Sequence, residues 1–147
     1  MNDIKIFSRE MAESSDFTSL PENTVVISFC DSYPDFIPVC YKDKCRRVFY
    51  VNVDDLDICS LSDYDMSFET FFPEAKDLAQ FIVKALSECS TIICQCEYGQ
   101  SRSAACAAAI LEFTCKRGIE IFADYRYCPN QLIFNKLYAE LKNIGNI

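Results

Sequence analysis

The chain has 147 residues, of which 50% are hydrophobic, and carries a formal net charge of −8 with no histidine. This length is enough for one domain with a real core and too short for two ordinary ones, so we expect a single domain over 1–147. The acidity argues against a nucleic acid or an anionic membrane as a partner, and the missing histidine excludes histidine-dependent nucleophiles, general bases and metal sites.

The amino-terminal residues 1–10 carry charges but no apolar core, so they do not resemble a signal peptide. No later stretch approaches the roughly 18–20 apolar residues that a membrane span needs. We therefore expect a cytoplasmic protein with no membrane partner. Alternating residues predict a short strand over 4–7, and the polar segment 16–23 predicts a loop or a broken helix.

Two further strands are predicted between residues 24 and 67. Residues 24–30 form a mostly apolar run that begins with four β-branched residues, which is typical of a buried strand. Two prolines punctuate the following loop over 31–38. Residues 46–53 predict another strand, and an acidic, irregular segment then extends to about residue 67.

Helices alternate with one more strand in the second half of the chain. Residues 71–87 place an apolar stripe at helical spacing. A strand over 91–96 and a helix over 102–117, ended by Gly118, are predicted next, and Pro129 begins a last helix. This alternation indicates an α/β fold with a mostly parallel central sheet flanked by helices on both faces.

The ten cysteines do not form a disulfide pattern. Several lie singly within apolar strands and helices, where a reduced thiol behaves as a small hydrophobic group. Cys40, Cys45 and Cys59 lack a Cys-x2-Cys pair, so we expect no structural zinc site and no cofactor.

One loop, between the strand at 91–96 and the helix at 102–117, predicts an oxyanion cradle. Its backbone N–H groups, the start of the helix and the guanidinium of Arg102 would together enclose a tetrahedral anion. A thiol at Cys96 would lie in that positive field, which favours the thiolate. The predicted phosphate-binding residues are Cys96, Glu97, Tyr98, Gly99, Gln100, Ser101 and Arg102.

This Cys-x5-Arg-Ser pattern between a strand and a helix resembles the signature loop of the protein tyrosine phosphatase superfamily, in its small dual-specificity-type and bacterial members. The resemblance implies that Cys96 is the nucleophile and that Arg102 binds phosphate. The hydroxyl of Ser103 would assist hydrolysis of the phosphocysteine, or would only cap the helix. One position departs from the family, which usually has histidine before the nucleophile, whereas this chain has Gln95. The glutamine amide can still donate and accept hydrogen bonds.

Cleavage of a phosphate ester by a thiolate also needs an acid that protonates the leaving oxygen, and without histidine a carboxylic acid is the natural candidate. Asp55 is the favoured residue, because the run 49–56 resembles the passage from strand to acid in small bacterial tyrosine phosphatase-like proteins. Asp54 lies beside it, and Asp63 or Asp65 is closer to the family's usual spacing from the nucleophile. The alternative is that these acids only solvate a loop. Asn130 is expected to cap the last helix.

The sequence therefore predicts a protein tyrosine phosphatase that uses no metal, and leaves open whether it has dual specificity. Its expected substrate is a phosphorylated protein or a small aryl phosphate. Two other classes remain open. One is a rhodanese-like or arsenate-reductase-like thiolate enzyme, and the other is an inactive phosphate-binding module. Glu97 and the absence of lysine from the loop argue against a substrate with several phosphates.

The basic residues cluster at one place, Lys42, Lys44, Arg46 and Arg47. We expect this cluster to form a solvated strand edge. The alternative is that it frames the mouth of the catalytic pocket.

Overall fold

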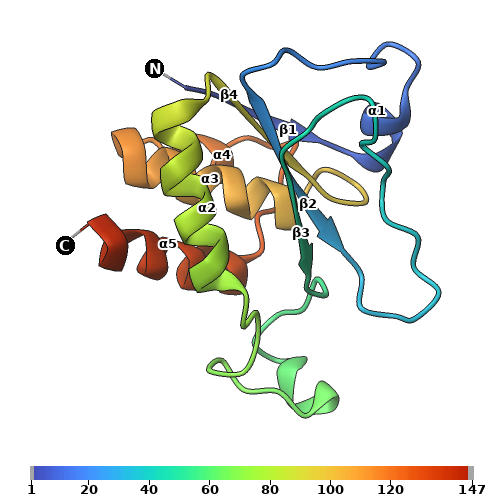
Figure 1. Cartoon of the computed structure of the whole chain (residues 1–147). Coiled ribbons are helices and arrows are strands. Elements are labelled where there is room, and N and C mark those ends of the chain that lie inside the picture. The colour runs from blue at the N-terminus through green and yellow to red at the C-terminus, as the bar shows by residue number, and fades with distance from the viewer. Residues whose placement is uncertain (1, 146–147) are drawn as a thin grey trace.

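A computed structural model of the chain describes residues 2–145, and a sheet of four parallel strands lies at its centre (Figure 1). The strands are β1 (Asp3–Phe7), β2 (Thr24–Cys30), β3 (Val48–Asn52) and β4 (Thr91–Gln95), in the spatial order β1-β4-β2-β3. All residues of β2 are buried, because this strand has neighbours on both edges and packing on both faces. The predicted α/β fold with a parallel sheet is confirmed.

Three long helices cover one face of the sheet, α2 (Ala75–Glu88), α3 (Arg102–Cys115) and α5 (Gln131–Gly145) (Figure 1). Alternate residues of β2, among them Val25 and Ile27, point to this face. Five of the six residues over 104–109 in α3 are alanine and all six are buried, and such small side chains let the helix approach the strands closely. No helix within residues 2–145 has the length and hydropathy needed to cross a membrane.

The other face of the sheet is covered mainly by loops. Val26 and Ile93 pack there against Val39 and Tyr41, and the short helix α1 (Arg9–Glu13) adds Ala12. We expected helices on both faces of the sheet. One face is covered by the three long helices, whereas the other has only the short helix α1. The loops between β1 and β2 and between β2 and β3 replace the missing helices.

Several helix boundaries differ from the predicted ones. No helix was predicted where α1 lies, although the Ser8 hydroxyl caps it by accepting a hydrogen bond from the Met11 N–H at 3.1 Å. The helix predicted over 71–87 begins at Ala75 because Phe72, three residues earlier, has a φ of 57°. Short helices η1 (Leu61–Tyr64) and α4 (Ile119–Phe122) lie in segments for which no helix was predicted.

The end of α3 shows why one of these predictions failed. Gly118 was expected to terminate this helix, but the left-handed residue there is Lys116, with a φ of 61°. A Cβ on Gly118 would lie 2.7 Å from the carbonyl oxygen of Ala108. The glycine is therefore required for close packing against α3 rather than for ending it.

Candidate active site

The loop over 96–101 connects the carboxyl end of β4 to the first residue of α3, as predicted. Gly99 has a φ of 67°, and a Cβ there would lie 2.8 Å from the backbone nitrogen of Ser8. The Cys96 N–H donates to the Phe7 carbonyl at 3.2 Å, and the Arg9 N–H donates to the Glu97 carbonyl at 3.1 Å. The loop is thus fixed against the end of β1, and only glycine fits at its closest approach.

The opposite side of the loop is held by the segment that leads into α5. The Cys128 N–H donates to the Gln100 carbonyl at 2.8 Å, and the Asn130 N–H donates to the Ser101 carbonyl at 3.2 Å. Across residues 2–145, nothing accepts a hydrogen bond from the backbone N–H groups of 97–101. These five donors are therefore free to bind an anion, as expected of such a loop.

Cys96 lies at the base of the loop and is 3% exposed. Its Sγ is 3.0 Å from the hydroxyl oxygen of Ser103, which is fully buried in the first turn of α3. The N-cap residue of α3 is Ser101, so Ser103 does not cap this helix. Its hydroxyl instead contacts the sulfur, where it can stabilise a thiolate by donating a hydrogen bond.

Two further buried thiols lie behind Cys96, on the side of the helices. Cys94 in β4 and Cys106 in α3 are both fully buried in the main core. Burial raises the pKa of the Cys106 thiol well above its ordinary value, and the adjacent Cys94 adds to the effect. This thiol is therefore neutral near pH 7 and acts as a packing group, as the sequence predicted.

Arg102 is almost buried, and its guanidinium is held by two acceptors. Nη1 donates to the Val53 carbonyl at 2.8 Å and forms an ion pair with Asp31 Oδ1 at 2.7 Å. Sequence reasoning did not select Asp31. Its position offered a signal, because it directly follows a buried strand whose carboxyl end shares an edge of the sheet with β4.

Asp55 lies at the loop, in contact with Ser101. Its Oδ1 accepts hydrogen bonds from the Ser101 hydroxyl at 2.7 Å and from Asn130 Nδ2 at 2.8 Å. The neighbouring Asp54 points elsewhere and accepts from the backbone N–H and the hydroxyl of Ser32, at 2.9 and 2.5 Å. Of the four candidate acids, Asp55 is the one that hydrogen-bonds to the loop.

The other two candidates, Asp63 and Asp65, lie away from these contacts. Asp63 is an exposed residue of η1, and Asp65 is the exposed residue that ends it, with a φ of 55°. Neither carboxylate hydrogen-bonds to the loop over 96–101.

Asn130 connects three parts of the site. Its Oδ1 accepts from the Ile133 N–H at 2.9 Å, which caps α5 and confirms the predicted capping. Its Nδ2 donates to Leu56 O at 2.8 Å as well as to Asp55. The segment that bears Asp55 is thereby attached to α5 and to the loop.

Gln95, at the position where the resembled family has histidine, supports the loop from below. It is 2% exposed, and its Nε2 donates to the Cys96 carbonyl at 3.0 Å. Its Oε1 accepts from the Ser28 hydroxyl at 2.5 Å and from the Tyr41 hydroxyl at 2.8 Å. Burial raises the pKa of Tyr41 well above its ordinary value, so this phenol remains a donor. The chain thus fixes its loop with an amide network instead of an imidazole.

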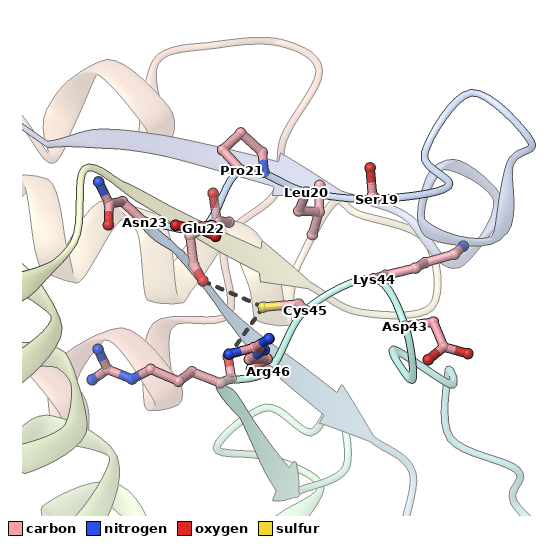
Figure 2. A pocket seen from close by; sticks show the side chains of 11 residues that line it. Ser19, Leu20, Pro21, Glu22, Asn23, Asp43, Lys44, Cys45 and Arg46 are labelled. Carbon is pink, nitrogen blue, oxygen red and sulfur yellow. Dashed lines mark hydrogen bonds between the residues drawn. The ribbon is translucent and has the colours of Figure 1, made fainter.

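Two cavities lie at opposite ends of the sheet. One, of about 630 Å³, adjoins the loop and is lined by Asp55, Ser101 and Asn130, with Phe68 at its side. The other, of about 720 Å³, lies at the amino end of β2 and is shown in Figure 2.

The second cavity contains most of the basic cluster, since Lys44, Arg46 and Arg47 line it. In Figure 2, Lys44 extends towards α1, where its Nζ donates to the Ala12 carbonyl at 2.8 Å, and Arg46 lies beside Cys45. The cluster therefore does not frame the mouth of the loop at Cys96.

No protein-family model and no curated protein sequence matches this chain. Solved structures of phosphatases do match its fold. PTPMT1 in complex with PI(5)P is 15% identical, with a TM-score of 0.52, over 98% of this chain and 93% of that one. Human DUSP28 is 13% identical, with a TM-score of 0.51, over 97% and 94%.

A third similar structure is a leucine-rich repeat and phosphatase domain-containing protein from Entamoeba histolytica, at 14% identity and a TM-score of 0.54. The match covers 99% of this chain and 90% of that one. This chain therefore has the fold of the protein tyrosine and dual-specificity phosphatases.

Proposed function

We propose that this chain is a protein tyrosine phosphatase of the dual-specificity type, which hydrolyses phosphate monoesters through a phosphocysteine on Cys96. One observation carries the proposal: the Cys96 thiol and five unpaired backbone N–H groups belong to one short loop, and Arg102 directly follows it. Such a loop can bind the three peripheral oxygens of a phosphoryl group while a thiolate attacks phosphorus from below.

In the first step, the Cys96 thiolate forms a bond to phosphorus as the bond between phosphorus and the leaving oxygen breaks. Asp55 donates its proton to that oxygen, which leaves as a neutral phenol or alcohol. The loop N–H groups and Arg102 stabilise the charge that spreads over the phosphoryl oxygens.

In the second step, water attacks the phosphocysteine and the sulfur leaves as a thiolate. The Asp55 carboxylate takes a proton from the water, and the Ser103 hydroxyl donates a hydrogen bond to the departing sulfur. The distance of 3.0 Å between Ser103 Oγ and Cys96 Sγ supports this role for Ser103.

The position of Asp55 favours hydrolysis over the other activities that the loop could support. A sulfurtransferase or an arsenate reductase needs no acid for an ester oxygen, and a binding module needs no acid at all. The contact with Ser101 puts the Asp55 carboxyl group beside the anion-binding loop, where its protonated form can supply a proton to a leaving oxygen.

The test is turnover of an aryl phosphate by the purified chain in the presence of a metal chelator. Cys96→Ser should abolish turnover, because the hydroxyl is a far weaker nucleophile than the thiolate. Cys128→Ser, at an exposed cysteine near the loop, is the matched control and should retain full activity. Undiminished turnover by Cys96→Ser would refute the proposal, as would persulfide transfer or arsenate reduction that exceeds phosphate release.

A further inference from the structure

Charge is distributed very unevenly between the two ends of the sheet. The segments 31–39, 53–74, 96–101 and 124–130 follow β2, β3 and β4 or lead into α5, and we call them together the acidic face. They contain eleven of the 22 acidic residues and a single basic one, Arg126. Lys42, Lys44, Arg46 and Arg47 lie in the segment that leads back to the amino end of β3.

Hydrogen bonds join the parts of the acidic face around the loop. Ser32 binds Asp54, Ser101 binds Asp55, and Cys128 binds Gln100. The segments after β2 and β3 leave the sheet at the same edge, as the arrowheads of the two strands indicate (Figure 1). Parts of the acidic face therefore border the loop that begins at Cys96.

Three of the cations at this edge are paired with acids, and Lys136 of α5 donates instead to backbone carbonyls within 68–71. The Arg126 guanidinium forms three hydrogen bonds with the Asp124 carboxylate, Arg9 pairs with Glu97 at 3.6 Å, and Arg102 pairs with Asp31. The acidic face thus presents a negative field outside the phosphate-binding loop. Such a field attracts positively charged partners and repels polyanions.

The acidic face also carries most of the large hydrophobic side chains that are exposed to solvent. Eight of the eleven large hydrophobic side chains that are exposed among residues 2–145 belong to it. Tyr98 in the loop is 79% exposed, Ile37 is 74% exposed and Tyr125 is 97% exposed. Tyr98 belongs to the loop itself, and Ile58 and Phe68 line the cavity beside it. Exposed apolar groups next to a binding loop indicate contact with a protein partner.

We propose that the substrate is a protein segment in which the phosphorylated residue is flanked by basic and apolar residues. This inference rests on the proposed phosphatase function and adds the nature of the flanking residues. Lysine and arginine in the partner would pair with the unneutralised carboxylates, and its apolar side chains would cover Tyr98, Ile37 and their neighbours. The phosphate alone would enter the positive loop.

The same distribution argues against a phosphoinositide, the ligand in the PTPMT1 complex to which the fold is similar. A lipid headgroup in an anionic membrane would bring negative charge against the acidic face, and that repulsion lowers the rate of association.

The test compares three phosphotyrosine peptides of equal length, with basic and apolar flanks, with acidic and apolar flanks, or with serine and glycine flanks. At low salt, kcat/KM for the basic peptide should exceed that for the acidic peptide by about tenfold, and the ratio should shrink in about 0.5 M salt because screening weakens the attraction. A small aryl phosphate and vesicles that contain PI(5)P are assayed in parallel.

Charge-removing variants identify the surface responsible. The double variant Asp35→Asn and Asp57→Asn should reduce the advantage of the basic peptide by about threefold and leave aryl phosphate turnover unchanged. The control, Asp3→Asn with Glu22→Gln, removes the same charge at the opposite end of the sheet and should change neither quantity.

The outcomes separate this inference from the proposed function. Turnover of the aryl phosphate with equal rates on the basic and acidic peptides, or with faster turnover of the vesicles, overturns the inference and leaves the phosphatase activity intact. If no substrate is turned over, the proposed function fails. The inference about the flanking residues is then tested by the binding of the three peptides to Cys96→Ser. Tighter binding of the basic peptide supports the inference, and equal binding, or no binding, overturns it.

Discussion

Asp31 and Arg102 form an ion pair of 2.7 Å beside the loop that begins at Cys96. The Arg102 side chain is 6% exposed, so its charge depends on this one carboxylate and on the carbonyl of Val53. An anion bound in the loop would supply a second counter-charge to the same guanidinium. Asp31 therefore both orients Arg102 and competes electrostatically with phosphate.

Asp31→Asn should lower the free energy of unfolding by about 2 kcal/mol, because a nearly buried guanidinium loses its counter-charge. Vanadate, bound in the loop, would restore a negative charge there. The stabilisation by vanadate should accordingly be larger in Asp31→Asn than in the unchanged protein, as measured by thermal unfolding with and without the anion. An equal or smaller stabilisation would show that bound anion and Asp31 do not share Arg102.

The local parts of the fold and site were predictable from sequence. Strand β2 was predicted residue for residue, since a mostly apolar run rich in β-branched residues is bounded by Asn23 and Asp31. Cys96, Arg102 and Ser103 come together because one short loop and one helical turn hold them. Such arrangements depend on neighbouring residues only.

The long-range contacts were not predictable in the same way. Gln95 binds Ser28 and Tyr41, which are 67 and 54 residues away, and this depends on β4 lying beside β2 in the sheet. The ion pair of Asp31 with Arg102 depends on the same strand order. Hydrophobic periodicity indicates which residues form strands, but it does not specify which strands are neighbours.

The amide network of Gln95 gives a second prediction. Gln95→Leu would leave the Tyr41 hydroxyl and the Cys96 carbonyl without their partner in a buried position, at a cost of about 2–4 kcal/mol. Aryl phosphate turnover should fall as well, because the carbonyl of the nucleophile is no longer held. Urea unfolding and kcat are the measurements.

Tyr41→Phe is the control for this network, because it removes one donor and leaves the Ser28 hydroxyl on Gln95 Oε1. It should cost about 1 kcal/mol with little effect on turnover. If both variants lose the same stability and activity, Gln95 does not support the loop.

A third prediction concerns the leaving group. Asp55→Asn should reduce kcat/KM by about 100-fold on a phosphotyrosine peptide, because the phenolate leaves poorly without a proton. The loss should be much smaller on an aryl phosphate with an acidic phenol, which needs no protonation. The asparagine side chain keeps an oxygen for the Ser101 hydroxyl, so the geometry is largely retained.

Asp54→Asn is the matched control for Asp55→Asn, since its carboxylate binds Ser32 and not the loop. For Asp54→Asn, kcat/KM on the phosphotyrosine peptide and on the aryl phosphate with an acidic phenol should fall by a similar, small factor. A large, leaving-group-dependent loss in Asp54→Asn and none in Asp55→Asn would transfer the role of the acid to Asp54.

The last prediction concerns Thr24, at the amino end of β2. Among residues 2–145, its Oγ1 is the one buried side-chain oxygen or nitrogen without a hydrogen-bond partner. Thr24→Val keeps the β-branched shape and removes the unsatisfied hydroxyl, so the free energy of unfolding should rise by about 1 kcal/mol. Ser28→Ala, which removes a buried hydroxyl that does have a partner, should lower it by a similar amount. Urea unfolding of both variants separates the two cases, because a loss of stability in Thr24→Val equal to that in Ser28→Ala would mean that the Thr24 hydroxyl is bonded in solution.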